Sequence, residues 1–442
     1  MHEKLQAVFG DPVDEKALDQ IDTVLEDDRA IKGALMADHH LGYSMPIGGV
    51  VAYENAISPS GVGFDIACGN KCVRTDMLVD DLGETKPWMR LIQKNISFGL
   101  GRTNPDPVDH ELFDDEVWQH IDTKGEPLKQ KARQQLGTVG SGNHYVDLLR
   151  GEDGHLWIAN HFGSRGLGHT IATMGLRWAY GLAEGERGVE REEPAVLDLD
   201  TEQGKLYLAA MGLAGEYAYA GRNYVIDQVL GLLGRPQVTL EVHNHHNFAW
   251  LEEGLWVVRK GATPLTREPA FIGGSMGDVS VIVKGTPIPE GHAIGDKRAV
   301  VDIGALASAP HGAGRQMSRT QAAGKLRKMW VCPNRNCDFT PERSTGNAMS
   351  GYEKGKCPKC GQPLRKLRIR DTSDAKIDWA ATRKELDERG IVVLGSGADE
   401  APGVYKDLTT VLAQHSNIEV LHTLHPVGVV MAGSDEYDPY KD

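Results

Sequence analysis

The sequence predicts an α+β fold, in which mixed sheets of short strands are flanked by helices. Three observations lead to this prediction. Short apolar segments broken by glycine recur along the chain, and such segments are typical of strands joined by tight turns. One stretch of about thirty residues has the spacing of a long helix. The chain has 442 residues, of which 52 are glycine, so it can bury a large core and has the length of about two to three domains.

Helical patterns occur in three regions. Residues 202–233 form the clearest helix, and we interpret Tyr207, Tyr217 and Tyr219 within it as packing groups rather than a base-stacking surface. Apolar and small residues recur there with helical spacing, at Leu206, Ala209, Ala210, Leu213, Tyr217, Ala220 and Val225. The same spacing near the N-terminus involves Ala17, Ile21, Val24 and Leu25. Residues 87–135 are expected to be mostly helix or loop.

Strands are expected where apolar runs are short and bounded by turn residues. Residues 45–51 and 61–66 are apolar pieces separated by glycine, which predicts short strands and tight turns. Further strands are expected at 157–159, 238–242, 256–258 and 279–283. The first of these leads into a loop rich in glycine.

Charge and hydropathy limit the classes of function. The formal net charge of −14 argues against a surface that binds nucleic acid everywhere, although a local basic patch can still attract phosphates. No apolar run is long enough to span a bilayer, and the first ten residues are too polar for a signal peptide. We therefore expect a cytoplasmic protein without a membrane partner. In a reducing compartment its six cysteines are expected to be metal ligands or free thiols.

A segment rich in cysteine interrupts the apolar pattern between residues 330 and 370. Cys332 and Cys337 are followed by Cys357 and Cys360, and two such pairs can present four thiolates to a structural Zn²⁺. The segment and its flanks are also basic, through Lys325, Arg327, Lys328, Arg335, Lys354, Lys356, Lys359, Arg365, Lys366, Arg368 and Arg370. Two interpretations of this zinc ribbon stay open: a local contact with nucleic acid, and a solvated module that only adds stability.

The run His311-Gly312-Ala313-Gly314-Arg315 is the strongest single indication of chemistry. Glycines let a backbone approach a ligand closely, and their N–H groups can face phosphate oxygens. A histidine can act as base, ligand or nucleophile, and an arginine can bind phosphate with two hydrogen bonds. This run predicts a site for a phosphorylated ligand.

A second group of residues predicts a metal site. Asp65 and Cys68 are three residues apart, so both side chains can reach one ion, or Cys68 can bridge two ions. His144, His161 and His246 also lie in polar, glycine-rich contexts. One aspartate, one cysteine and three histidines can fill two adjacent sites and leave positions for a substrate phosphate. The donor types alone favour zinc, but the spacing does not select the metal.

Several motifs occur in a fixed order along the chain. They lie at residues 38–49, 65–69, 140–144, 163–169, 259–263, 274–277, 311–315, 317–319, 399–402 and 405–407. In this order they resemble the RtcB family of RNA-splicing ligases. The resemblance covers most of the chain outside the N-terminal segment and the zinc ribbon.

The resemblance implies an enzyme that joins an RNA 3′-phosphate or 2′,3′-cyclic phosphate to a 5′-hydroxyl, using GTP and two Mn²⁺ ions. His311 would be the nucleophile that becomes guanylylated, and Arg165, Arg315 or Arg319 would stabilise charge on the transferred phosphate. One ion would be held by Asp65, Cys68 and His144, and the other by Cys68, His161 and His246. The nucleotide site would include Asn143, Asp147, Asn247, Ser280, Ala313, Gly314 and Tyr405. The substrate would be a tRNA or rRNA, and an archease-like activator is a possible partner.

Three features depart from the family pattern. The C-terminal region contains Val430-Met431-Ala432-Gly433 where the family typically ends in Lys-Gly, whose lysine contacts guanine. Asp147 stands where the family usually has glutamate. The zinc ribbon is an insertion shortly after Arg319. The first two changes concern recognition of the base, and the third concerns the choice of RNA.

The whole chain is thus expected to be a catalytic core in two parts, residues 1–329 and 371–442, interrupted by a zinc ribbon at 330–370. Two other functions are considered. A metal-dependent RNA-end phosphoesterase or nucleotidyl transferase would keep the metal ligands without joining ends. A non-catalytic RNA-binding protein would use the ribbon as its binding element.

Overall fold

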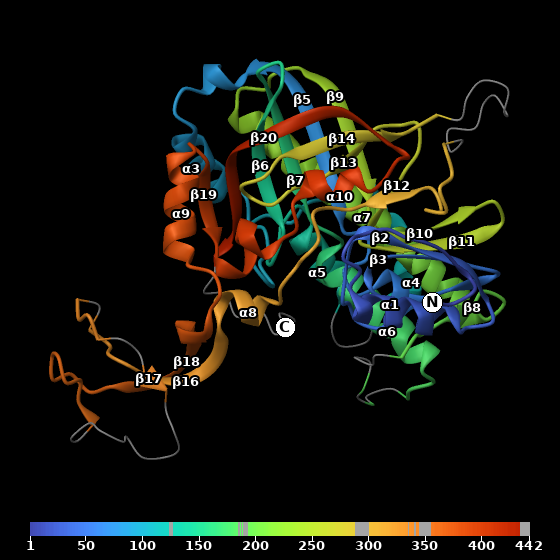
Figure 1. Cartoon of the computed structure of the whole chain (residues 1–442), viewed down its shortest axis with the longest axis horizontal. Coiled ribbons are helices and arrows are strands. Elements are labelled where there is room, and N and C mark those ends of the chain that lie inside the picture. Colours follow the sequence, from blue (N-terminus) through green and yellow to red (C-terminus); the bar gives the residue numbers. More distant parts are fainter. Residues whose placement is uncertain are drawn as a thin grey trace.

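A computed structural model describes residues 1–122, 127–183, 186, 188, 193–287, 300–334, 336–339, 342–343 and 355–433. Two large sheets and a set of helices form the body, and a narrow three-stranded sheet projects from it (Figure 1). This arrangement confirms the predicted mixture of sheets and helices. No helix within the described ranges combines the length and the hydropathy needed to cross a lipid bilayer.

The first sheet has five strands in the order β1-β2-β3-β11-β10. Their bounds are Leu5–Val8 (β1), Ala30–His40 (β2), Ile47–Tyr53 (β3), Asn247–Glu252 (β10) and Leu255–Lys260 (β11). Helix α1 (Glu15–Leu25) begins at Asp14, whose carboxylate accepts hydrogen bonds from the backbone N–H groups of Lys16 and Ala17. Its four residues with predicted helical spacing are buried. The strands expected at 45–51 and 256–258 are confirmed as β3 and β11.

The second sheet has the strand order β13-β14-β20-β6-β7-β5-β9, and β19 pairs with β20. The bounds are Gly69–Leu78 (β5), Tyr145–Gly151 (β6), His155–His161 (β7), Val238–His245 (β9), Ala270–Ile272 (β13), Ser280–Gly285 (β14), Val392–Ser396 (β19) and Ile418–Gly433 (β20). The strands expected at 157–159, 238–242 and 279–283 lie in β7, β9 and β14. This sheet carries most of the candidate site, because the site histidines lie at its strand ends.

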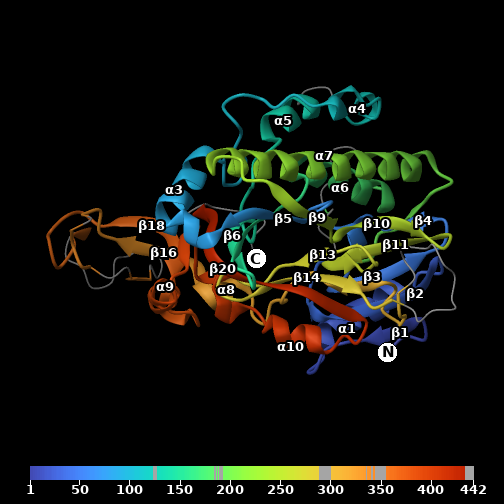
Figure 2. The ribbon, with the colours of Figure 1, turned by 90° about the horizontal axis from the view of Figure 1, so that it is seen from above.

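Helix α7 (Glu202–Leu232) runs the length of the body above the sheets (Figure 2). It begins at Thr201, whose side chain accepts a hydrogen bond from the N–H of Gly204. Tyr207 and Tyr217 are buried among apolar side chains, which confirms their interpretation as packing groups. Helix α6 (Arg165–Ala179) packs against α7. The predicted helix at 202–233 is therefore confirmed almost to the residue.

The segment at 61–66 was expected to contain a short strand, and here the structure differs. Residues Pro59–Val62 form a short helix, α2. Ser58 accepts a hydrogen bond from the N–H of Gly61 at 2.9 Å, and proline occupies the first turn. A serine cap followed by proline favours a helix start over a strand.

The remaining elements are short. The helices are Thr85–Asn95 (α3), Trp118–Ile121 (α4), Leu128–Gln135 (α5), Arg319–Ala323 (α8), Trp379–Glu388 (α9) and Leu408–Ala413 (α10). The strands of two small sheets are Ala56–Ile57 (β4), Leu197–Asp198 (β8), Ala262–Pro264 (β12) and Ser308–Pro310 (β15). The projecting sheet contains Lys325–Val331 (β16), Glu342–Arg343 (β17) and Arg365–Asp371 (β18). The expected ribbon limits of 330 and 370 fall inside β16 and β18, and the division into domains stays a prediction.

Arg222 of α7 joins the helix to the loops that carry the candidate site. Its guanidinium is fully buried and donates to the carbonyls of Ala67 and Phe162, at 3.0 and 2.7 Å. It also contacts ring nitrogens of His243 and His245, at 2.9 and 2.8 Å. Burial lowers the pKa of Arg222 to about 10, so the side chain stays charged at neutral pH. Ala67 precedes Cys68 and Phe162 follows His161, so this one side chain fixes two candidate metal ligands.

We expect Arg222→Met to lower the free energy of unfolding by about 3 kcal/mol or more, because two buried carbonyls lose their donors. Urea unfolding measures the change. The control is Arg235→Met, since the ion pair of Arg235 with Asp227 lies on the surface and contributes little. Equal stability of the two variants would contradict a structural role for Arg222.

Candidate active site

Four neighbouring strands end at the same edge of the second sheet, and each end carries a candidate ligand. Cys68 precedes β5, His144 precedes β6, His161 is the last residue of β7 and His246 follows β9. Because β6, β7, β5 and β9 are adjacent and antiparallel, these termini meet. The topology thus brings together residues that are 178 positions apart in sequence at the extremes.

A tight loop places Asp65 and Cys68. The N–H of Cys68 donates to the carbonyl of Asp65 at 3.1 Å, and Ala67 between them has a φ of 60°. Gly69 then passes so close to β9 that a Cβ there would lie 2.1 Å from the carbonyl oxygen of Asn244. A residue without a side chain is required for this approach.

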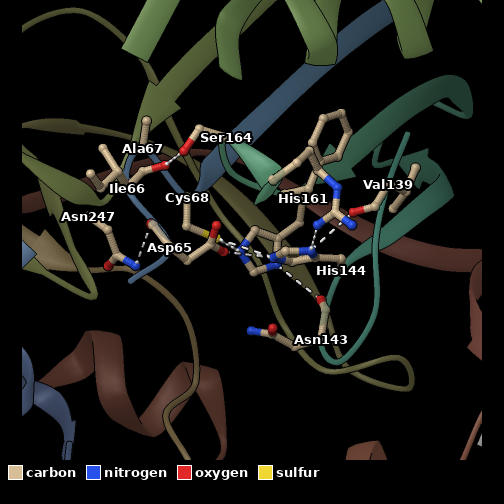
Figure 3. Close-up of polar contacts among 12 residues, drawn as sticks. Asp65, Ile66, Ala67, Cys68, Val139, Asn143, His144, His161, Ser164 and Asn247 are labelled. Atoms are coloured by element: carbon tan, nitrogen blue, oxygen red, sulfur yellow. Dashed lines mark hydrogen bonds and ion pairs between the residues drawn. The ribbon is translucent and has the colours of Figure 1, made fainter. Parts of the chain in front are cut away.

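The candidate ligands form two groups that share Cys68. Figure 3 shows Asp65, Cys68, His144 and His161 gathered together. In the first group, Nε2 of His144 lies 3.0 Å from Oδ2 of Asp65 and 3.7 Å from Sγ of Cys68. In the second, Nε2 of His161 lies 3.2 Å from Sγ of Cys68 and 3.3 Å from Nε2 of His246. These are the two sets that the family resemblance implies. The binding of ions there stays a prediction.

Hydrogen bonds orient two of the imidazoles for metal binding. Nδ1 of His144 faces the carbonyl of Val139 at 3.0 Å, and Nδ1 of His161 faces the carbonyl of Asn143 at 3.1 Å (Figure 3). A neutral ring that donates from Nδ1 leaves a lone pair on Nε2, toward the cluster. Burial lowers the pKa of His161 and of His246 well below the usual range, which favours the neutral form that binds metals. A buried thiol with imidazoles and a carboxylate is a donor set that fits transition-metal ions.

His311 follows β15 and is held by Asp38 of β2. Nδ1 of His311 lies 2.6 Å from Oδ2 of Asp38, and this oxygen also accepts from the backbone N–H groups of His311 and Gly312. Burial raises the pKa of Asp38, but the charge and hydrogen bonds of His311 outweigh it and the pKa is lowered overall. An ionised Asp38 holds the proton of His311 on Nδ1 and leaves a lone pair on Nε2. The ring centroid of His311 is 4.9 Å from that of His246.

A pocket lies beside His311 and the second ligand group. Its lining includes Asn143, Asp147, Ala313, Gly314 and Tyr405, five of the residues expected at the nucleotide site. Met431, from the C-terminal run that departs from the family pattern, is also in the lining. Others there, for which the sequence interpretation gave no role, include His40, Asn70, Tyr145, Ser275 and Val429. Among the described residues, Oδ1 of Asp147 has no hydrogen-bond partner, and burial raises the pKa of this carboxyl well above its usual range.

Two arginines form part of the pocket wall and are balanced by acidic residues. Arg315 donates to the carbonyl of Asp399 at 2.8 Å and to the hydroxyl of Tyr405 at 3.2 Å. Arg319 forms an ion pair with Glu400, and Glu400 also accepts a hydrogen bond from Tyr405. The guanidinium groups are therefore positioned before any ligand arrives.

Arg165 lies elsewhere, in a second pocket on the side of Asp65 and His144. This pocket is also lined by Lys131, His169 and Arg319. The side chain of Arg165 occupies the space beside Gly140, where an added Cβ would lie 2.0 Å from its Nη1. Arg319 and Asn143 line both pockets, so the two spaces adjoin.

Two residues expected at the nucleotide site are not part of either lining. Asn247 donates to the carbonyl of Asp65 at 3.3 Å and accepts from the N–H of Gly261 at 2.7 Å. Ser280 accepts a hydrogen bond from the N–H of Gly274 at 3.0 Å. In this structure both side chains hold the loops that shape the site.

Asp38 and Glu400 were not given roles by the sequence interpretation, although both lie in motifs that it singled out. Acidic residues are common on surfaces, and only their burial here, at 0% and 3% exposure, marks them. Arg222 had no sequence signal beyond its place in an apolar helix.

The four cysteines of the ribbon form a third cluster. Sγ of Cys332 lies 3.3 Å from Sγ of Cys360, and Sγ of Cys337 lies 3.7 Å from Sγ of Cys357. All four sulfurs lie within 4.8 Å of one another. Four thiols at these distances can hold one metal ion in a tetrahedral arrangement.

Comparison with known proteins defines the family. A family model described as "tRNA-splicing ligase RtcB" matches residues 26–333. The chain is 32% identical over 323 residues to the RNA-splicing ligase RtcB of Escherichia coli K12, covering 65% of this chain and 75% of the relative. It is 32% identical over 372 residues to the tRNA-splicing ligase RtcB of Thermococcus kodakarensis, covering 66% and 74%. For the tRNA-splicing ligase RtcB of Archaeoglobus fulgidus the identity is 29% over 408 residues, covering 73% and 80%.

The protein thus combines an α+β fold with two adjacent groups of candidate metal ligands. A further histidine, His311, lies beside a pocket. The chain belongs to the RtcB family. This finding confirms the resemblance that the motifs indicated.

We expect the two ligand groups to respond separately to mutation. Cys68→Ala removes a donor from both groups and should abolish tight binding of two metal ions, whereas His246→Ala should remove one and leave one. Metal content after titration with Mn²⁺ and gel filtration measures this. Cys72→Ala is a matched control, because this buried thiol belongs to neither group. Two ions retained in Cys68→Ala would disprove the shared ligand.

Proposed function

We propose that this protein is an RNA ligase that joins RNA ends carrying a 3′-phosphate or 2′,3′-cyclic phosphate to 5′-hydroxyl ends. The observation that carries the proposal is His311, which is oriented by buried Asp38 beside a pocket and two groups of metal ligands. Membership of the RtcB family and the names of its relatives as tRNA-splicing and RNA-splicing ligases support the same reaction.

In the first step of the proposed reaction, Nε2 of His311 attacks the α-phosphorus of GTP, a P–N bond forms and pyrophosphate leaves. Asp38 favours this step because it keeps the Nδ1 proton in place and balances the positive charge that the ring gains. Arg315 and Arg319, already held by acidic neighbours, lie where they can contact phosphate oxygens.

In the later steps, an oxygen of the RNA 3′-phosphate attacks the guanylylated His311 and takes the GMP group, which frees the imidazole. The 5′-hydroxyl of the second RNA end then attacks the activated 3′-phosphate, and GMP leaves as the phosphodiester forms. Arg165 lines the adjoining pocket together with Asp65 and His144. Its guanidinium is suited to bind the phosphate of an RNA end there.

Two Mn²⁺ ions would be held by Asp65, Cys68 and His144, and by Cys68, His161 and His246. When bound, such ions offset the negative charge of the triphosphate and of the RNA phosphate. Cys68 would be the bridging ligand, since its sulfur lies within reach of both groups.

The base of the nucleotide is proposed to lie near Asp147 and Met431. Oδ1 of Asp147 is buried and has no partner among the described residues, so it can accept a hydrogen bond from an N–H of guanine. Asn143, Ala313, Gly314 and Tyr405 line the same pocket, and Asn247 and Ser280 support it through loop hydrogen bonds. GTP is the proposed nucleotide.

The inserted segment at 330–370 is proposed to be a zinc ribbon, with Cys332, Cys337, Cys357 and Cys360 as ligands of one structural Zn²⁺. The rest of the chain would then be one catalytic core in two parts. A cytoplasmic location, tRNA or rRNA substrates and an archease-like activator complete the proposal.

The first test is labelling of the protein with each α-³²P nucleoside triphosphate in the presence of Mn²⁺. We expect label from GTP in the wild type and none in His311→Ala. Asp38→Asn should slow labelling by roughly tenfold or more, because the charge that orients and stabilises the ring is lost.

Label from several nucleotides would keep the mechanism and change the base preference at Asp147. A wild-type protein that holds both metal ions but takes label from no nucleotide would exclude this ligase and favour the phosphoesterase alternative.

For the ribbon, we expect Cys357→Ser with Cys360→Ser to release about one Zn²⁺ per chain. Zinc content by atomic absorption measures this. The double variant should still be labelled by GTP, because His311 and its partners lie outside the ribbon. An unchanged zinc content would remove the assignment.

A further inference from the structure

The segment at 325–370 has a charge opposite to that of the rest of the chain. It contains twelve lysine and arginine residues and three acidic ones, a net charge of +9. The chain as a whole carries −14, so the remainder carries −23. A concentration of cations in an otherwise acidic protein creates a local electrostatic field that attracts polyanions.

The strand register places part of this charge on one face of the ribbon. In the antiparallel pair β16–β18, Trp330 lies opposite Lys366, and Leu326 lies opposite Arg370. Residues two apart on a strand share a face, so Lys328 lies on the same face between them. We call Leu326, Lys328, Trp330, Lys366 and Arg370 the ribbon face.

The ribbon face is turned to solvent and combines cations with an aromatic ring. Lys328 and Lys366 are exposed, and Leu326 is 39% exposed. Nζ of Lys366 lies 5.6 Å from the ring centroid of Trp330. On the opposite face, Met329 is buried and Arg327 forms an ion pair with Asp371. Cations next to an aromatic side chain are the combination that binds nucleic acid strands without base selection.

The ribbon begins at the candidate active site. Arg319, which lines both pockets, is the first residue of α8, and β16 starts only six positions later, at Lys325. Arg370 donates to the carbonyl of Gly324 at 3.1 Å, and the returning chain binds α8 through the N–H of Lys376 and the carbonyl of Gln321. The base of the ribbon is therefore fixed to α8, and the ribbon projects from there (Figure 1).

The dimensions suit a strand that leaves the active site. A helix of five residues and a strand of seven span about 8 and about 23 Å. The ribbon face thus extends from roughly 10 to roughly 30 Å along the chain from Arg319.

We infer that the ribbon face binds the phosphate backbone of the RNA substrate several nucleotides away from the end that is joined. This inference rests on the proposed function, from which it takes RNA as the polyanion. It decides between the two interpretations that the sequence left open, a contact with nucleic acid and a module for stability alone. It also gives the insertion a role in substrate choice, because only RNAs that extend beyond the pockets gain this contact.

The test compares two charge-reversed proteins of equal net charge. Lys328→Glu with Lys366→Glu changes the ribbon face, and Lys16→Glu with Lys205→Glu changes the first turns of α1 and α7, where a glutamate is compatible with the helix dipole. Binding of 3′-phosphorylated RNAs of about 4 and about 20 nucleotides is measured by fluorescence anisotropy without GTP, over a series of salt concentrations.

We expect the ribbon variant to bind the long RNA about tenfold or more weakly. The slope of log affinity against log salt concentration should fall by the amount that corresponds to about two phosphate contacts. The short RNA and the Lys16/Lys205 variant should show wild-type affinity, and both variants should be labelled by GTP as the wild type is. Zinc content and thermal unfolding check that the ribbon is folded, and Lys328→Gln with Lys366→Gln replaces the reversed pair if it is not.

Equal affinity of wild type and ribbon variant for the long RNA would overturn the inference and leave the ribbon as a stability module or a surface for an acidic protein. An equal loss for both RNA lengths would also overturn it. Failure of the proposed function is recognised separately, since a wild-type protein that binds RNA through the ribbon face but takes no label from any nucleotide loses the ligase assignment and keeps this inference.

Discussion

The candidate active site depends on the hydrogen bonds that the buried guanidinium of Arg222 donates. Arg222 lies on the long helix α7 and binds the backbone carbonyls of Ala67 and Phe162, next to Cys68 and His161. Both buried carbonyls thereby receive a hydrogen bond from a charged donor. The same group contacts His243 and His245 on β9. One side chain therefore connects the helical layer to three of the strands whose ends carry ligands.

The site concentrates groups that accept protons or positive charge, and this has an electrostatic consequence. Asp65, Cys68 and three histidines face one another, and burial lowers the pKa of His161 and of His246, which favours their neutral form. Such an arrangement is stabilised when cations join it. In the pocket beside it the charges are already paired, because Arg315 and Arg319 both form ion pairs with Glu400. The candidate metal groups and the pocket beside them therefore differ in the charge that each can accept.

The ribbon adds a property that the body of the protein lacks. The body is strongly acidic, whereas the ribbon is basic and is fixed to α8 next to both pockets. In the role proposed for the ribbon face, a basic projection next to the pockets attracts a polyanion that an acidic surface repels. Under that proposal, this separation of charge links the basic segment at 325–370 to the choice of substrate.

The sequence by itself determined the family, the long helix, most strands and the residues that gather in the two candidate metal groups. Motifs and apolar spacing can be read directly from the chain. They were enough to predict that Tyr217 packs in the core and that residues 238–242 form a strand. The tertiary structure alone decided which residues meet. Asp38 became the buried partner of His311, and among the described residues Oδ1 of Asp147, in the pocket lining, has no hydrogen-bond partner. The tertiary structure also showed that Asn247 and Ser280 hold neighbouring loops through hydrogen bonds, while their place at the nucleotide site stays a prediction. These differences depend on sheet topology, which joins residues far apart in the chain and which no local pattern records.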